Sequence, residues 1–317
     1  MSEIEPPFQL KRGKEIAKII EFEDTLFQTY TWHAIDTVPY KGRVFIIHGF
    51  REHYGIWLRF IDFMIGNGYD VFYFDQRGEG KTVLKDGSKG YPYEEFVFNS
   101  TTFLIDYNLK EMENEGKDTK KFNMLGFSRG GGFLLNYLSH GELKDKINTY
   151  CAVGPLITIH PDSMSSSPSP WVTWLGLQLG AVPYLQRFPW KTGLNVDFAT
   201  GDSEYRDYLE KTANPEKTTA NLLEIREFIY GGADVLTEQS QARVDKTKPL
   251  LLIHGENDHV NNPRSSELYM EKLNKIEGMK NKSFFKVKDG KHCVLIDVET
   301  VRTTSMNKIL EFFNQYN

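Results

Sequence analysis

The chain has little cysteine, no strong charge of one sign and no long apolar run. Cys151 and Cys293 are its two cysteines in 317 residues, too few for a disulfide framework, and we expect both to be buried as small apolar side chains. The net charge of −5 leaves no electrostatic footprint for a nucleic acid. No apolar run is as long as the roughly 18 residues that a membrane-spanning helix needs. No cluster of metal-ligating residues is visible. The acidic start, Met1–Pro7, lacks the apolar stretch of a secretory signal, so we expect a cytoplasmic protein that is not secreted.

What the sequence does contain is the pattern of an α/β fold. Apolar residues make up 40% of the chain and charged residues 26%, an ordinary composition that can bury a sizeable core. Two strand-like runs, 19–22 and 26–32, flank Asp24-Thr25 and predict a hairpin at a sheet edge. Strand-like and helix-like segments then alternate through residue 154. This alternation predicts a mostly parallel central sheet with helices on both faces.

The most informative motif is Gly126-x-Ser128-x-Gly130. An apolar run, Phe122–Leu125, precedes it as a buried strand would, and a helix-like segment, Phe133–Leu138, follows it. This strand–turn–helix context predicts a nucleophile elbow, a turn so sharp that the serine is strained and exposes its oxygen at the top of the sheet. The flanking glycines leave room for that backbone. We therefore predict that Ser128 is a catalytic nucleophile.

A serine hydroxyl is a poor nucleophile near pH 7, so it needs a base and a group that orients the base. In this arrangement the acid and then the histidine follow the serine, on loops after late strands. The strand-like run Leu250–Gly255 leads to Asp258, and the strand-like run Ser283–Val287 leads to His292. We predict that His292 is the general base and then acid, and that Asp258 orients the imidazole and stabilises its charged form.

Rival residues are set aside by their positions. Glu256 is the nearest alternative to Asp258 as the acid. His48 and His254 precede glycines at strand ends and are expected to bond loop backbone, whereas His259, directly after Asp258, is expected to point away from it. The remaining histidines have no strand-end acid partner in the required order: His33, His53, His140 and His160.

Acyl transfer also requires preorganised donors for the oxyanion. One is predicted to be the backbone N–H of Arg129, the residue after the nucleophile. The other is predicted to be the N–H of Phe50, which follows the strand-like run Val44–Ile47. Gly49 before it allows a close approach of the backbone.

These residues together resemble a known family, the monoacylglycerol lipase and lysophospholipase branch of the α/β-hydrolases, from about residue 20 to 315. The motifs that carry the resemblance are His48-Gly49-Phe50-x-Glu52-His53, Phe74-Asp75-Gln76-Arg77-Gly78-x-Gly80, Gly126-x-Ser128-x-Gly130-Gly131 and His254-Gly255-x-x-Asp258. A further segment, Gly154-Pro155-Leu156-Ile157 with His160-Pro161 after it, is similar to the fungal monoacylglycerol lipases in particular. The resemblance implies an α/β-hydrolase fold with an inserted cap, and hydrolysis of a monoacylglycerol to glycerol and fatty acid through an acyl-enzyme, without a cofactor.

The sequence also departs from that family. The family commonly has histidine before the serine and methionine after it, where this chain has Phe127 and Arg129. Arg129 places a permanent charge beside the acyl site, and it either pairs with a carboxylate or favours an anionic head group such as a lysophospholipid. Animal members have an arginine that helps to bind glycerol, and the corresponding position here is Ile56. Fungal members lack this arginine too. Glu52 either contacts glycerol or braces its loop.

The alternation of strands and helices stops between Gly154 and about Gly231, which predicts a cap insertion at 156–231 between two parts of the core, 1–155 and 232–317. The insertion contains a Ser/Pro-rich stretch, 163–170, and a helix-like run from about Pro215 to Tyr230. Between these lies an apolar segment that includes Trp171, Trp174, Leu175, Leu177, Leu179 and Val182. An apolar cap either packs on the core or docks on a lipid surface, and we expect a peripheral association with membranes or lipid droplets.

Several activities share this machinery. Monoacylglycerol hydrolysis is the function that the resemblance favours, and a lysophospholipase or a broad carboxylesterase would use the same residues. An acyltransferase would pass the acyl group to an alcohol instead of water. A catalytically silent binding module is a different class, against which the intact set Ser128, Asp258 and His292 argues. The oligomeric state is not indicated by the sequence.

Overall fold

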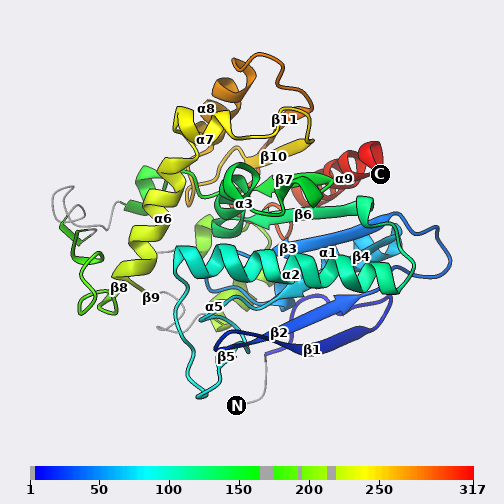
Figure 1. Ribbon diagram of the computed structural model, residues 1–317, viewed down its shortest axis with the longest axis horizontal. Coiled ribbons are helices and arrows are strands. Elements are labelled where there is room, and N and C mark those ends of the chain that lie inside the picture. The colour runs from blue at the N-terminus through cyan, green and yellow to red at the C-terminus, as the bar shows by residue number, and fades with distance from the viewer. Residues whose placement is uncertain (1–3, 165–174, 177, 192–194, 213–218) are drawn as a thin grey trace.

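A single large sheet organises the chain, of which the computed structural model describes residues 4–164, 175–176, 178–191, 195–212 and 219–317. The strands lie in the order β1-β2-β4-β3-β6-β7-β10-β11, with β5 paired to β2 (Figure 1). The pairs β1/β2, β2/β4 and β2/β5 are antiparallel and the other pairs are parallel, which confirms the prediction of a mostly parallel sheet. The strands are β1 Glu15–Phe22, β2 Thr25–Trp32, β3 Gly42–Ile47, β4 Tyr69–Phe74, β5 Val83–Leu84, β6 Phe122–Phe127, β7 Thr149–Val153, β10 Leu250–Gly255 and β11 Lys282–Val287.

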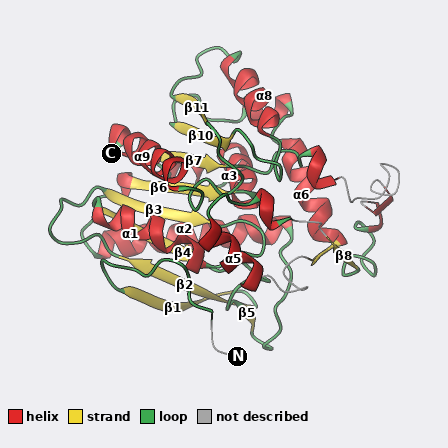
Figure 2. Ribbon diagram, turned by 180° about the vertical axis from the view of Figure 1, so that it is seen from behind, coloured by secondary structure: helices red, strands yellow, loops and turns green. Residues whose placement is uncertain are grey.

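Helices cover both faces of this sheet, as predicted. In Figure 1, α2 and α3 lie in front of the sheet, and in the reverse view of Figure 2 α1 and α9 lie in front of it. Each face has its own cluster of buried apolar side chains. The helices packed on the sheet are α1 Leu58–Gly66, α2 Glu94–Asn114, α3 Arg129–His140, α8 Pro263–Asn274 and α9 Glu299–Tyr316.

The central parallel strands are mostly apolar because both of their faces are covered. All residues of β3, β4, β6 and β10 are buried. The edge strand β1 differs, since it is mostly exposed and forms the predicted hairpin with β2. The edge strand β1 therefore includes the polar residues Glu15, Lys18 and Glu21, whereas β6 is buried along its whole length up to Ser128.

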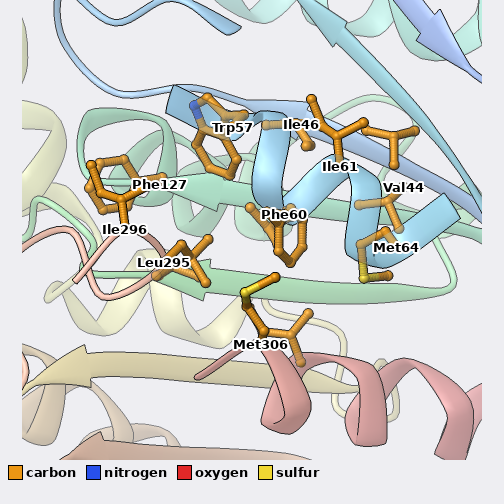
Figure 3. Close-up of a cluster of buried hydrophobic side chains, with 14 of the residues drawn as sticks. Val44, Ile46, Trp57, Phe60, Ile61, Met64, Phe127, Leu295, Ile296 and Met306 are labelled. Atoms are coloured by element: carbon orange, nitrogen blue, oxygen red, sulfur yellow. The ribbon is translucent and has the colours of Figure 1, made fainter. Parts of the chain in front are cut away.

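One of the two apolar clusters lies on the face of the sheet that α1 and α9 cover, and it includes the end of β6. Figure 3 shows Phe60 of α1 and Met306 of α9 facing each other across this cluster, with Leu295 near them. Phe127, the last residue of β6, belongs to the same cluster, and its ring lies 5.9 Å from that of Trp57. The residue before Ser128 is thus a core residue that fixes the end of β6.

The segment between β7 and β10 contains short elements beside the sheet: β8 Pro189–Lys191, α5 Ser203–Thr212, β9 Thr219–Asn221, α6 Leu222–Asp234 and α7 Glu238–Ala242. The predicted helix from Pro215 to Tyr230 was wrong at both ends, and Pro215 itself lies outside the described residues. The helix begins at Leu222 because Asn221 and Glu224 form a capping box, in which each side chain accepts a hydrogen bond from the other residue's N–H. Within the described residues, no helix is both long and apolar enough to cross a bilayer.

Candidate active site

Ser128 lies in the sharp turn between β6 and α3. Its backbone has φ 53° and ψ −117°, a region that residues with a side chain rarely adopt. The surrounding backbone holds this conformation: the Ser128 N–H donates to the Val153 carbonyl at 2.9 Å, and the Ser128 carbonyl accepts from the Leu156 N–H at 2.8 Å. The turn is therefore anchored to the end of β7, and it has the strained geometry predicted for a nucleophile elbow.

The glycines around Ser128 are required by close backbone contacts. A Cβ on Gly126 would lie 2.4 Å from the carbonyl oxygen of Gly130. A Cβ on Gly130 would lie 2.2 Å from the carbonyl oxygen of Ile47, at the end of β3. These distances are far below van der Waals contact, so the turn brings α3 directly against the sheet only because both positions lack a side chain.

The three residues predicted as a triad meet at one edge of the sheet. His292 lies in the loop after β11, and its Nε2 is 2.9 Å from Ser128 Oγ. His292 Nδ1 is 2.7 Å from Asp258 Oδ2. With Nδ1–H donating to the carboxylate, the lone pair on Nε2 faces the serine hydroxyl, which is the arrangement a general base requires.

Asp258 is held as an acceptor by several groups at once. Its Oδ1 accepts from the N–H groups of Val260 at 2.8 Å and Asn261 at 2.9 Å. Its Oδ2 accepts from His292 and also from His254 Nε2 at 3.0 Å. Burial acts to raise the pKa of Asp258, but His292 and His254 outweigh it and hold that pKa well below the ordinary value. The carboxylate is thus ionised and fixed in orientation.

His254 corrects one expectation from the sequence. It bonds side chains and not loop backbone, because its other ring atom, Nδ1, lies 2.8 Å from the hydroxyl of Ser266. His48 does bond backbone as expected, with Nδ1 2.7 Å from the Gly49 carbonyl and Nε2 accepting from the Gln76 N–H at 3.1 Å. His259 points away from Asp258, as expected, toward Asp162 at 2.6 Å. Glu256, the rival acid, is exposed.

Asn261 is a residue at the site that the sequence analysis missed. Its Nδ2 donates to the Gly154 carbonyl at 2.8 Å and lies 3.5 Å from Ser128 Oγ. The backbone N–H of the same residue bonds Asp258. An asparagine in a polar loop carries no sequence signal of its own, so only the folded loop shows that it ties the acid to the nucleophile's turn.

The two predicted oxyanion donors are backbone groups on either side of Ser128. Arg129 is the first residue of α3, so its N–H has no acceptor within the helix. Phe50 follows β3 after Gly49, where a Cβ would lie 3.1 Å from Ser128 Cβ. Glu52 fixes this loop, since its Oε2 accepts from the Gly49 N–H at 2.7 Å. Bracing of the loop, one of the two roles expected for Glu52, is therefore present.

Ser128 and His292 line a cavity of about 230 Å³. Its walls are mostly apolar, and residues from the segment between β7 and β10 contribute to them: Leu156, Ile159, Val196, Ala199, Leu209, Ile225 and Phe228. Phe50, Glu52, Arg129 and Cys293 also line it. Burial raises the pKa of Glu52 to about 7, against a hydrogen bond from Gly49 that lowers it. The second cysteine, Cys151, is buried within β7.

The Arg129 side chain is paired, which was one of its two expected roles. Its Nη2 donates to Gln76 Oε1 at 2.9 Å, and its Nη1 lies 3.6 Å from Glu79 Oε1. The guanidinium also lies over the ring of Phe228, 5.5 Å from the centroid. Gln76 and Glu79 belong to the loop after β4, which carries the sequence motif Phe74-Asp75-Gln76-Arg77-Gly78-x-Gly80.

Two groups of potential metal ligands occur among the described residues, although the sequence analysis names none. His160, Asp162 and His259 gather in one group, and His33, Asp70 and Glu115 in another. In the second group, Asp70 is already paired with Arg43 at 3.3 Å and with Lys117 at 2.7 Å. Neither group includes a triad residue.

The chain is similar to several known proteins. The profile of the family described as "Serine aminopeptidase, S33" (Hydrolase_4) matches residues 39–299. The chain is 34% identical to the monoglyceride lipase of Saccharomyces cerevisiae over 269 residues, 84% of this chain and 83% of the relative. A putative monoglyceride lipase of Schizosaccharomyces pombe is 29% identical over 139 residues, 43% of this chain and 34% of the relative.

Solved structures give the same result for the fold. A soluble variant of the S. cerevisiae monoglyceride lipase, in complex with a substrate analog, superposes with a TM-score of 0.87 at 27% identity, covering 99% of both chains. The monoacylglycerol lipase of Paleococcus ferrophilus has a TM-score of 0.71 at 20% identity, covering 92% of this chain and 99% of its own. The α/β-hydrolase fold expected from the sequence is confirmed.

Proposed function

This chain belongs to the serine aminopeptidase, S33 (Hydrolase_4) family, and on that premise we propose that it hydrolyses monoacylglycerols to glycerol and free fatty acid. It is a homologue of monoglyceride lipase and a carboxylic ester hydrolase. The observation that carries the proposal is the hydrogen-bonded series Ser128, His292 and Asp258 beside an apolar cavity.

The first half of the proposed reaction acylates the enzyme. His292 Nε2 takes the proton of the Ser128 hydroxyl while Oγ attacks the ester carbonyl carbon. The N–H groups of Phe50 and Arg129 stabilise the negative charge that develops on the carbonyl oxygen. The bond between the acyl carbon and the ester oxygen then breaks. The proton on His292 passes to that oxygen, and glycerol leaves.

The second half releases the fatty acid. A water molecule gives a proton to the same Nε2 of His292 and attacks the acyl carbon. When the Ser128 ester bond breaks, the proton returns to Oγ and the fatty acid departs. Asp258 stays ionised throughout and stabilises the imidazolium that forms in both halves.

The lining of the cavity supports a lipid ester as the substrate. Its apolar walls suit an acyl chain, because burying each methylene there contributes about 0.8 kcal/mol. Glu52 lies in the same cavity as Ser128, and we propose that it contacts the glycerol hydroxyls in addition to bracing the loop. A carboxyl group with a pKa of about 7 can accept a hydrogen bond from a neutral polyol or donate one to it.

A substrate panel tests this function. Purified protein should release fatty acid from a monoacylglycerol faster than from a diacylglycerol, a triacylglycerol or a lysophospholipid, and Ser128→Ala should lose nearly all of that activity. Faster turnover of the lysophospholipid would favour a lysophospholipase, and equal rates on short esters a broad carboxylesterase. Acyl transfer to an added alcohol in preference to water would favour an acyltransferase.

We also propose that residues 156–231 act as a cap that meets a lipid surface, so that the protein is intracellular and peripheral on membranes or lipid droplets. Exposed apolar side chains support this: Tyr184 is 97% exposed, Phe188 62% and Val182 41%. Trp171 and Trp174 of the predicted apolar segment lie outside the described residues. Aromatic side chains of this kind insert at the acyl boundary of a bilayer.

Flotation with liposomes tests the lipid surface. The double variant Tyr184→Glu, Phe188→Glu should float much less than the parent protein, because two charges replace the inserting side chains. A matched control is Ile19→Glu on β1, a site that is 68% exposed and belongs to the edge hairpin. Equal loss in the control, or no loss in the double variant, would contradict docking through this surface.

A further inference from the structure

Four charged side chains form a cluster beside the predicted oxyanion donors. Arg51 lies 3.4 Å from Glu79 and 3.2 Å from Glu224, and Arg129 lies 3.6 Å from Glu79. The two glutamates are 3% and 1% exposed, so neither charge is solvated by bulk water. The cluster contains two positive and two negative groups, and its formal charge is therefore zero.

Glu79 is the member that contacts both oxyanion segments. Its Oε1 accepts from the backbone N–H of Arg51 at 3.3 Å, and Arg51 directly follows Phe50. The same carboxylate pairs with the side chain of Arg129, whose own N–H is the second predicted donor. One buried carboxylate thus holds the residues on both sides of the place where the ester oxygen would lie.

The cluster also borders the substrate cavity. Arg51 and Arg129 both line the cavity that contains Ser128. In such a position an uncompensated guanidinium would attract an anionic head group, since Coulomb energies in a poorly solvated site are several times those in water. Glu79 and Glu224 cancel that attraction within the protein.

We propose that Glu79 is a positioning and specificity-determining residue: it fixes both oxyanion segments and, by neutralising Arg51 and Arg129, makes the site select esters with uncharged head groups. The inference rests on the proposed ester hydrolysis and adds the charge class of the substrate. The residue after the predicted nucleophile is therefore an arginine that has its own counter-ion, Glu79.

The test compares kcat/KM for a 1-monoacylglycerol with that for a 1-acylglycerol 3-phosphate of the same acyl chain. E79Q leaves one positive charge uncompensated, so kcat/KM for the anionic substrate relative to that for the neutral substrate should rise about fivefold. R129M removes a positive charge instead, so the ratio should fall. The double variant E79Q/R129M should return close to the parent ratio, although its absolute rates are lower.

A matched control is E111Q. Glu111 pairs with Arg43 at 2.7 Å in another ion-pair cluster, at the start of β3 and not at its end, so this variant should leave the ratio unchanged. Thermal melts verify that each variant is folded, and the opposite signs expected for E79Q and R129M distinguish charge from loosened structure. Shifts of the same sign, or no shift, would overturn the inference. If the parent cleaves neither ester, the proposed function fails instead.

Discussion

Replacing Gly130 by alanine tests whether the contact between α3 and β3 sets the position of the nucleophile. The added Cβ would lie 2.2 Å from the Ile47 carbonyl oxygen and 2.5 Å from that of His48. Both are backbone atoms, so no side-chain rotation relieves the clash. Reaching the shortest distance that real Cβ atoms show, 3.0 Å, moves the helix start away from the sheet by about 0.8 Å.

The magnitude follows from competing effects. Overpacking of this kind costs about 1–3 kcal/mol, while alanine in a helix is favoured over glycine by about 1 kcal/mol. A net loss of up to about 2 kcal/mol in the free energy of unfolding is expected. Activity should suffer more, since a displacement of about 1 Å at a reacting group costs about 10²-fold in rate.

The assay combines urea unfolding with the labelling rate of Ser128 by a fluorophosphonate. Gly131→Ala is the matched control in the same helical turn, where the nearest atoms, Cα and Cβ of Pro155 among them, lie 3.0 to 3.1 Å away. It should label at a rate within a few-fold of the parent. If Gly130→Ala labels and unfolds like Gly131→Ala, the close packing of the elbow does not control the nucleophile.

Two other predictions concern the acid and the loop. Asp258→Asn keeps the shape of the site but lets the imidazole of His292 adopt the wrong tautomer, so kcat should fall about 10⁴-fold. Activity assays measure this loss, and thermal melts show whether the variant is folded. A tenfold loss or less would argue against the role assigned to Asp258. Burial raises the pKa of Glu52 to about 7, so the folded state holds a proton that the unfolded chain has lost, and stability should fall by about 1 kcal/mol per pH unit between roughly 4.5 and 7. Glu52→Gln should flatten that part of the stability–pH curve, and an unchanged slope would show that Glu52 titrates normally.

The elbow and the order of the triad could be predicted from sequence because both depend on local patterns. An apolar strand run, two glycines and a helix-like segment define the turn at Ser128 without any distant contact. Asp258 and His292 each follow a strand-like run, and parallel strands end at the same edge of a sheet. Their meeting therefore follows from the fold class.

Contacts between loops could not be predicted in the same way. Glu79 and Arg129 are 50 residues apart, and they meet because β4 and β6 both flank β3 in the sheet, an order that no local pattern indicates. The contacts of His254 and Asn261 with Asp258 depend on the exact conformation of one polar loop. Short segments such as β9 have too little periodicity to be separated from the helix that follows them.

Active-site titration with a fluorophosphonate tests whether Ser128 is the nucleophile for monoacylglycerol hydrolysis. Protein labelled to increasing extents is assayed for fatty acid release from a monoacylglycerol, and the adduct is located by mass spectrometry. We expect activity to fall in proportion to labelling and to reach zero at one adduct per chain, with the adduct on Ser128. Full labelling of Ser128 with monoacylglycerol hydrolysis retained, or loss of activity through an adduct elsewhere, would contradict this expectation.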